Sequence, residues 1–168
     1  MAHPLEEVMK TDRFVLIGDA SEDRFPAMSF HCYTAVGKPF YCLDLSGLTE
    51  SRGYTKGARV YTSVTELPDD RSDLAIVWLR PKSAVRGVEA AHEAGCRRIW
   101  FSFRSGHPDA VTRAKALGME IVEIGRCPVY YLERQVPICK GHTLMVKLSG
   151  TYGRPPQTDP NQPRRELF

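Results

Sequence analysis

The chain has 168 residues, of which 42% are hydrophobic, and a formal net charge of +3 at pH 7. This length favours one domain with its own core. The mild charge and the lack of basic runs with interleaved aromatics argue against nucleic-acid binding, and no apolar run approaches the length that spans a bilayer. The first ten residues lack the charged-then-apolar order of a signal peptide, so we expect a cytoplasmic protein with no membrane or nucleic-acid partner.

The stretch from residue 14 to residue 28 has the order of a strand, a glycine turn and a helix. The apolar run Phe14–Ile17 predicts a buried parallel strand that ends at Gly18. A polar loop follows, Asp19–Arg24, and Pro26 stands where the first helical turn is expected, since proline is favoured there. Such a unit points backbone N–H groups and the positive end of a helix dipole at one spot, which is a seat for phosphate.

From this unit to residue 134, strand-like and helix-like patterns alternate. Residues 1–13 predict a short helix or cap, short apolar runs predict strands, and apolar residues at helical spacing predict helices. The further segments are helix Pro26–Val36, strand Pro39–Leu45, loop Ser46–Gly57, strand Arg59–Tyr61, a helical turn at Ser63–Glu66, strand Leu74–Leu79, helix Ala84–Ala94 capped by Ser83, strand Arg98–Phe103, a helix from Pro108 and strand Met119–Ile124. This alternation predicts an α/β fold, a three-layer sandwich with a mostly parallel sheet between layers of helices.

The alternation stops after Tyr131. Many polar residues follow, interrupted by prolines at positions 137, 155, 156, 160 and 163. We therefore predict a domain over residues 1–134 and an irregular, Pro-rich C-terminal extension over residues 135–168. The extension is expected to be flexible or to wrap over the surface, and the alternative is an arm that binds a protein partner.

Ligands of such sheets bind beyond the carboxyl ends of the strands, where the strand order reverses. The candidate walls are therefore the loops 18–24, 44–47, 79–83 and 102–107. The residues expected to contact a ligand there are Gly18, Asp19, Ala20, Ser21, Arg24, Pro26, Asp44, Leu45, Leu79, Arg80, Pro81 and Ser102. Ser21 can donate a hydroxyl to phosphate and Arg24 a bidentate guanidinium, although a solvated surface role is open for Arg24 as well.

Several short segments together resemble the small stand-alone CoA-binding proteins, which look like the N-terminal CoA-binding domain of the succinyl-CoA synthetase alpha subunit. They fall within residues 12–130 and are Gly18-x-x-Ser21 with Pro26, Val60–Val64, Leu79-Arg80-Pro81, Ala94–Trp100 and Arg126-Cys127-Pro128. The resemblance implies a Rossmann-like fold with coenzyme A or an acyl-CoA as ligand. It implies that the first loop (Gly18, Ala20, Ser21, Arg24) holds the CoA phosphates, and that Arg80 and Pro81 line the path of the adenine or pantetheine.

The segment after the second strand, Leu43-Asp44-Leu45-Ser46, departs from the Val-Asn-Pro-like run that is usual in that family. Asp44 would repel the 3′-phosphate of CoA, whereas NAD-binding domains use an acid at this point for ribose hydroxyls. The G-x-G-x-x-G loop of those domains is absent, and Arg52 and Lys56 could offset the acid or meet the 3′-phosphate. Three functions stay open: a non-catalytic or regulatory CoA-binding module, an NAD(H)-binding enzyme or redox sensor, and a scaffold that acts through its extension.

The remaining reactive residue types form no catalytic motif. His107 precedes a predicted helix at the ligand end of the sheet, where it contacts the ligand, caps the helix or is exposed to solvent. Cys127 is either a thiol made reactive by the neighbouring arginine, which would lower its pKa, or a small core residue like most of the other cysteines. Cys139 and His142 form Cys-x-x-His, but no second pair stands at zinc-ligand spacing, so no metal is expected.

Overall fold

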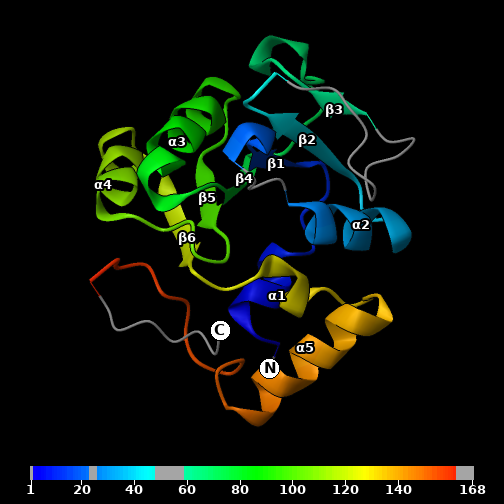
Figure 1. Cartoon of the computed structure of the whole chain (residues 1–168). Helices are drawn as coiled ribbons and strands as arrows, with labels where there is room; N and C mark the ends of the chain where they lie inside the picture. The colour runs from blue at the N-terminus through cyan, green and yellow to red at the C-terminus, as the bar shows by residue number, and fades with distance from the viewer. Residues whose placement is uncertain (1, 23–25, 48–58, 162–168) are drawn as a thin grey trace.

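The computed structural model describes residues 2–22, 26–47 and 59–161, which form a six-stranded sheet with helices on both faces (Figure 1). The strands are β1 (Phe14–Gly18), β2 (Phe40–Asp44), β3 (Val60–Tyr61), β4 (Leu74–Trp78), β5 (Arg98–Phe101) and β6 (Glu120–Ile124). The α-helices are α1 (Pro4–Val8), α2 (Ala27–Ala35), α3 (Ala84–Glu93), α4 (Pro108–Ala116) and α5 (Pro137–Leu148), and the 3₁₀ helices are η1 (Ala20–Glu22), η2 (Val64–Glu66), η3 (Pro81–Ser83) and η4 (Pro128–Tyr131). Within these ranges, no helix is long and apolar enough to cross a bilayer.

The six described strands are all parallel and lie in the order β3-β2-β1-β4-β5-β6. Gly18 at the end of β1 is paired with Asp44 of β2 on one side and with Trp78 of β4 on the other. The chain first builds the sheet outward from β1 to β3 and then returns to β4, so the strand order reverses between β1 and β4. The Rossmann-like α/β fold expected from the sequence is confirmed, and this reversal marks the crevice in which such folds bind ligands.

The side chains of β1 alternate between two hydrophobic cores, because successive residues of a strand point to opposite faces of the sheet. Val15 and Ile17 pack in the core under α3 and α4, whereas Phe14 and Leu16 pack in the core formed with α1, α2 and α5. All five residues of β1 are buried. A strand covered on both faces has no polar side, which explains the continuous apolar runs in the sequence.

The observed helix ends lie close to the predicted ones. Pro26 is the N-cap residue of α2 rather than its first residue. Gly37 follows α2 with a φ of 71°, and Gly95 follows α3 with a φ of 80°, a left-handed conformation that glycine adopts without steric cost. The prediction that the side chain of Ser83 caps α3 is wrong: its hydroxyl donates to a carboxylate oxygen of Glu22 and thereby joins η3 to η1.

The C-terminal extension contains a helix that was not predicted. Helix α5 begins at Pro137, a position where proline costs no hydrogen bond. It buries Cys139, Thr143 and Val146, which recur at helical spacing. The helix packs against η4, and Cys139 joins the neighbouring core. The irregular part of the extension is therefore confined, within the described chain, to the segments on either side of α5.

A buried ion pair attaches the segment after α5 to the end of β6. Arg126 Nη2 lies 2.6 Å from Glu123 Oε2, and both side chains are at least 95% buried. The same guanidinium donates to the carbonyl oxygens of Arg154 (2.9 Å) and Pro155 (2.7 Å). Glu123 Oε2 also accepts the backbone N–H of Gln157 at 2.9 Å. This part of the extension is thus fixed over the carboxyl end of β6.

Gly106, in the loop after β5, has no room for a side chain. A Cβ placed on Gly106 would lie 2.3 Å from Cγ2 of Ile124, a buried β-branched residue. We expect Gly106→Ala to lower the free energy of unfolding in urea by about 1–3 kcal/mol, the usual cost of overpacking. Gly141 of α5 is the matched control, because a Cβ there meets nothing within 4 Å. Gly141→Ala should raise the stability by up to about 1 kcal/mol, and equal losses in both variants would contradict the assigned packing.

Candidate functional site

Buried polar side chains collect at the carboxyl ends of the strands. Asp19 follows β1, Asp44 ends β2 and Ser102 follows β5, and each is at most 1% exposed. Within the described part of the chain, Asp44 Oδ2, Ser102 Oγ and Glu22 Oε2 are buried at this edge without a hydrogen-bond partner. Buried polar atoms in folded proteins are nearly always paired. This edge therefore offers hydrogen-bonding groups that a bound molecule or water can satisfy.

Asp44 holds the first loop against the second. Its Oδ1 accepts the backbone N–H of Ala20 at 3.1 Å and, from Ser46, the backbone N–H at 2.9 Å and the hydroxyl at 2.7 Å. The loop after β1 is also tied to β2 by the N–H of Leu45, which donates to the carbonyl of Gly18 at 2.9 Å. One carboxylate oxygen thus organises both loops, and the other faces no donor within the described residues.

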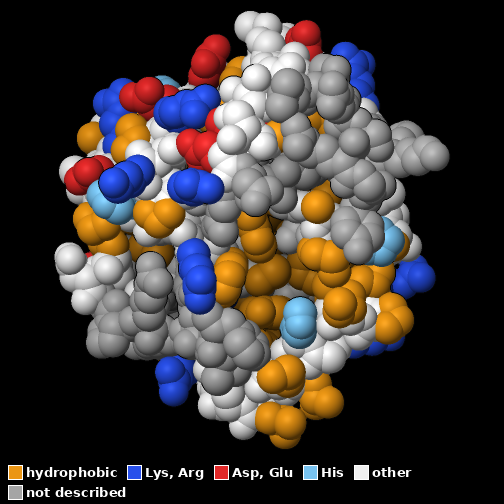
Figure 2. Space-filling model, in the orientation of Figure 1, with side chains coloured by type: hydrophobic (Ala, Val, Ile, Leu, Met, Phe, Trp, Pro, Cys, Tyr) orange, Lys and Arg blue, Asp and Glu red, His pale blue; other side chains and the backbone are white. Residues whose placement is uncertain are grey.

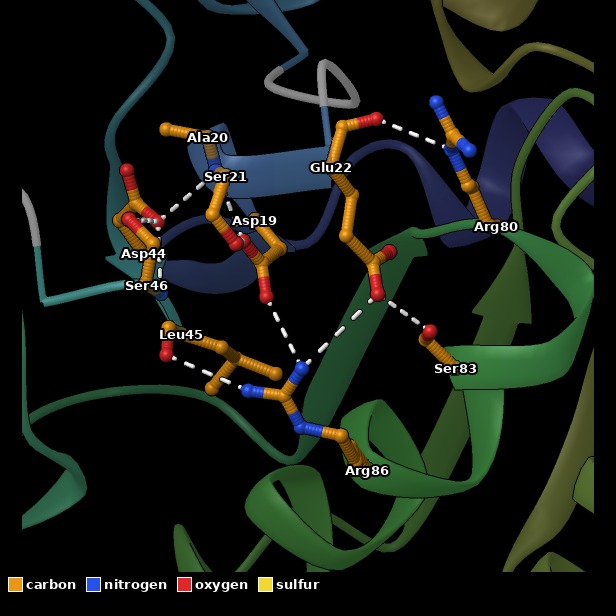
Figure 3. Close-up of polar contacts among 10 residues, drawn as sticks. All are labelled: Asp19, Ala20, Ser21, Glu22, Asp44, Leu45, Ser46, Arg80, Ser83 and Arg86. Atoms are coloured by element: carbon orange, nitrogen blue, oxygen red, sulfur yellow. Dashed lines mark hydrogen bonds and ion pairs between the residues drawn. The ribbon is translucent and has the colours of Figure 1, made fainter.

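Asp19 pairs with an arginine that comes from α3. Its Oδ2 lies 3.0 Å from Arg86 Nη1, and its Oδ1 accepts the backbone N–H and the hydroxyl of Ser21 (Figure 3). Burial raises the pKa of Asp19, but the hydrogen bonds from Ser21 and the pairing with Arg86 outweigh it, so this pKa lies below its ordinary value. Arg86 Nη2 also donates to the carbonyl oxygen of Leu45 at 3.3 Å, so it bridges the loops after β1 and β2.

Glu22 connects the first loop to the loop after β4. Its backbone carbonyl accepts Arg80 Nε at 3.0 Å, and one of its carboxylate oxygens accepts the hydroxyl of Ser83 (Figure 3). The same oxygen lies 3.9 Å from Arg86 Nη1. The predicted site residue Arg80 therefore contacts the loop that follows Gly18, in agreement with the prediction that both loops lie at the carboxyl edge of the sheet.

The N-terminus of α2 lies beyond β1 at the same edge, and none of the residues that the structure describes caps it with a side chain. Pro26 makes no capping hydrogen bond, and the first turn of α2 contains no acid. The first N–H groups of a helix lack intrahelical partners, and the helix dipole adds positive potential there. In contrast, the N–H groups of Ala20 and Ser21 already bind carboxylates. The first turn of α2 is thus the better seat for an anionic group in this loop.

The other predicted wall residues take different positions. Leu79 is fully buried and packs in the core with α3, so its side chain lies below the edge. Leu45 is half-buried against the same core. Pro81 begins η3 and lines a small cavity. The predicted cations Arg24, Arg52 and Lys56 lie outside the described residues.

That cavity, of about 200 Å³, lies at the ends of β5 and β6 and is closed in part by the extension. Its lining residues are Pro81, Arg104, Gly106, His107, Pro108, Ile124, Gly125, Gln157 and Pro160. His107 Nδ1 accepts the backbone N–H of Asp109 at 3.3 Å, so the expectation that His107 caps a helix is confirmed for α4. The participation of residues 157 and 160 was not foreseen from the sequence.

The cysteines do not form a reactive centre. Burial raises the pKa of the Cys127 thiol to about 11, and the guanidinium of the adjacent Arg126 pairs with Glu123. The lowered pKa that the sequence allowed is therefore wrong. The other four cysteines are buried and free, with the pKa of Cys96 raised by burial to about 12. Within the described ranges, no three His, Cys, Asp or Glu side chains form a group that could hold a metal.

The strand order defines a doubly wound, Rossmann-like α/β domain, a fold that generally binds ligands at the carboxyl edge of its sheet. The chain belongs to the CoA binding domain family, whose model matches residues 14–133. No curated protein matches the chain.

Solved structures share this fold. A hypothetical protein from Pyrococcus horikoshii OT3 has a TM-score of 0.60 at 22% identity, over 76% of this chain and 86% of its own. The crystal structure of Prb, described as the PH1109 protein redesigned for binding, gives 0.58 at 23% identity over the same shares. A conserved hypothetical protein from Pyrococcus furiosus gives 0.52 at 23% identity, over 69% of this chain and 95% of its own. At 22–23% sequence identity, the similarity to these structures shows a shared fold only.

Proposed function

We propose that the protein binds coenzyme A or an acyl-CoA at the carboxyl edge of the sheet, as a non-catalytic or regulatory module. The observation that carries the proposal is the uncapped, acid-free N-terminus of α2 directly beyond β1, at the point where the strand order reverses. An anionic pyrophosphate is the group that such a helix end favours. Membership of the CoA binding domain family supports CoA as the molecule that carries it.

A hollow on the surface supports the same ligand. Near the centre of the face drawn in Figure 2, between α2 and β6, the surface is hollowed and apolar side chains line the hollow. Ligand sites of folded proteins are mostly apolar clefts with a few polar groups that fix orientation. The pantetheine arm of CoA is long, and the methylene and methyl groups between its amides suit an apolar cleft of this kind beside a phosphate seat.

A thermal-shift titration tests the proposal. CoA and acetyl-CoA should each raise the melting temperature, because a ligand at 100 times its dissociation constant adds about 2.7 kcal/mol to the stability. Inorganic pyrophosphate alone should give a much smaller shift. The absence of a shift with both CoA and acetyl-CoA at millimolar concentration would overturn the proposal.

A single acid in the first turn of α2 should weaken this binding. We expect Ala27→Asp to lower the affinity for CoA about tenfold or more, since a carboxylate there repels the pyrophosphate and competes for the free N–H groups. Isothermal titration calorimetry measures the change. Ile138→Asp is the matched control, because it puts an acid into the first turn of α5, where Ile138 is 55% exposed. Equal affinities of the two variants would place the phosphates elsewhere.

The buried thiols and the capping histidine support a binding role without catalysis. The raised pKa values of Cys127 and Cys96 leave these thiols protonated at neutral pH, and the Nδ1 atom of His107 is engaged in the cap of α4. Because all five cysteines are free, we further propose that the protein acts in a reducing compartment, the cytoplasm.

An NAD(H)-binding role is the second candidate, and Asp44 is the observation that favours it. A buried acid at the end of β2 is the group with which dinucleotide-binding domains hold ribose hydroxyls. NADH fluorescence enhancement on titration with the protein tests this candidate, and no enhancement at millimolar NADH would remove it.

A protein partner of the extension stays a prediction. Helix α5 exposes four large apolar side chains, those of Ile138, Leu144, Met145 and Leu148. Leu144 also lines a groove of about 960 Å³. The lysines of α5, Lys140 and Lys147, line the same groove, so the arrangement suits an apolar segment that carries acids. Leu144→Glu should abolish capture of such a partner without unfolding the protein.

A further inference from the structure

The free oxygen of Asp44 distinguishes this site from a simple phosphate seat. Asp44 is 1% exposed, and its Oδ1 already accepts the three donors of Ala20 and Ser46. Its Oδ2 is buried and has no partner among the residues that the structure describes. A buried carboxylate oxygen without a donor is unfavourable. The group that completes it must donate a hydrogen bond, and a phosphate oxygen at neutral pH has no proton to donate.

The charges around Asp44 disfavour a phosphate as well. Among the described residues of these loops and of α3, three carboxylates gather, those of Asp19, Glu22 and Asp44, against the two guanidinium groups of Arg80 and Arg86 (Figure 3). Arg86 is held by Asp19 and by a backbone carbonyl. Arg80 is held by the carbonyl of Glu22. Neither cation forms a bond with Asp44 that would neutralise it.

The position of Asp44 fits a ribose. It ends β2 and is paired with Gly18, the last residue of β1, one strand away from the reversal of strand order. The seat proposed for the pyrophosphate, the first turn of α2, follows the same β1. In an adenine nucleotide the ribose is attached to the pyrophosphate, so a nucleotide held by α2 places its ribose next to the strand ends.

From these observations we infer that Asp44 accepts a hydrogen bond from a ribose hydroxyl, and that the site prefers an adenine nucleotide with an unphosphorylated ribose, such as dephospho-CoA, to CoA itself. This inference rests on the proposed function, because it concerns the same site and the same class of ligand. It makes Asp44 a specificity-determining residue.

Calorimetric titration of the full chain with CoA and with dephospho-CoA tests the inference. The wild-type protein should bind dephospho-CoA about tenfold tighter or more, because CoA carries a charged phosphate in place of the 3′-hydroxyl that dephospho-CoA can donate to the buried carboxylate of Asp44. In Asp44→Asn the amide oxygen can still accept the loop donors while the amide N–H₂ can donate to a phosphate. The ratio of the two affinities should therefore fall to about one. Asp69→Asn is the matched control, because Asp69 is fully exposed on the surface, and its ratio should equal that of the wild type.

The outcomes separate the two proposals. Equal or tighter binding of CoA by the wild type, or an unchanged ratio in Asp44→Asn, overturns the role of Asp44 and leaves the CoA-binding proposal intact. Binding of neither ligand removes both. If Asp44→Asn does not fold, the wild-type comparison of adenosine 3′-phosphate 5′-diphosphate with ADP, which differ only in the 3′-phosphate, decides alone: ADP should bind tighter, and the reverse order overturns the inference.

Discussion

Replacement of Arg126 by methionine should lower the free energy of unfolding by about 3–5 kcal/mol, because it leaves the buried carboxylate of Glu123 without its counter-ion. The two side chains are 5% and 1% exposed and their charged atoms lie 2.6 Å apart. The same variant loses the bonds to the carbonyl oxygens of Arg154 and Pro155. Urea denaturation followed by circular dichroism measures the loss. Limited proteolysis should also cut the segment after α5 faster than in the wild type.

The exposed pair of Arg113 and Glu89 provides the control for this prediction. Their charged atoms are 3.0 Å apart, but the side chains are 44% and 54% exposed, so Arg113→Met should change the stability by at most about 1 kcal/mol. The double variant with Arg126→Met and Glu123→Leu should recover part of the loss, since no unpaired charge stays buried. A loss for Arg126→Met no larger than that for Arg113→Met would show that the extension is not held by the buried pair.

Trp100→Ala should cost about 3–5 kcal/mol, the range for removal of a large aromatic side chain from a core. Trp100 is fully buried on the face of the sheet that packs against α1, α2 and α5. Its Nε1–H donates to the carbonyl oxygen of Arg126 at 2.8 Å, so the indole also positions the turn that carries the buried ion pair. Urea denaturation followed by far-ultraviolet circular dichroism measures the effect.

Trp100→Phe separates the two contributions of the indole. Phenylalanine keeps most of the apolar volume but has no N–H, so the carbonyl of Arg126 loses its buried donor, at a cost of about 1–3 kcal/mol. We therefore expect the free energy of unfolding of Trp100→Phe to lie between that of the wild type and that of Trp100→Ala. Equal losses for the two variants would contradict this prediction. They would mean that packing of the fully buried ring contributes nothing to stability.

The fold could be predicted from the sequence because its signals are local. A strand buried on both faces has to be apolar throughout, as in Phe14–Ile17. A glycine such as Gly37 marks the C-terminus of a helix in the sequence. Even so, Ser83 shows the limit of local reasoning. Serine is a favoured N-cap residue. Here, however, the hydroxyl of Ser83 donates its hydrogen bond to the carboxylate of Glu22, which lies 61 residues away in the chain.

Helix α5 was missed because the segment after it is rich in proline and because Pro137 was grouped with those prolines as an interruption of regular structure. A signal was present: Pro137 stands at the start, and Gly150, with a φ of 73°, stands after the end. The residues that α5 buries include Cys139 and Thr143, which are too small or too polar to form an obvious apolar stripe. The exposed leucines of the opposite side obscure the period further.

The sequence predicted which loops meet at the carboxyl edge of the sheet, but not the contacts among their side chains. The carboxyl edge and the residues Asp19, Asp44 and Arg80 follow from topology alone. The role of Arg86 does not, because it comes from the first turn of α3, 67 residues after Asp19, and no motif marks it. The sequence also suggested Ser21 as a phosphate donor, whereas its hydroxyl and its N–H are already given to Asp19.

A two-dimensional ¹⁵N–¹H NMR titration of the protein with CoA tests directly whether the ligand binds at the carboxyl edge of the sheet. If CoA binds at the carboxyl edge with its pyrophosphate on α2, the backbone amide signals of Ala27 and Met28 should shift on saturation. The amide of Gly141 in α5 should stay unchanged. Saturable shifts confined to α5 and the groove beside it, or no shifts at millimolar CoA, would contradict the account.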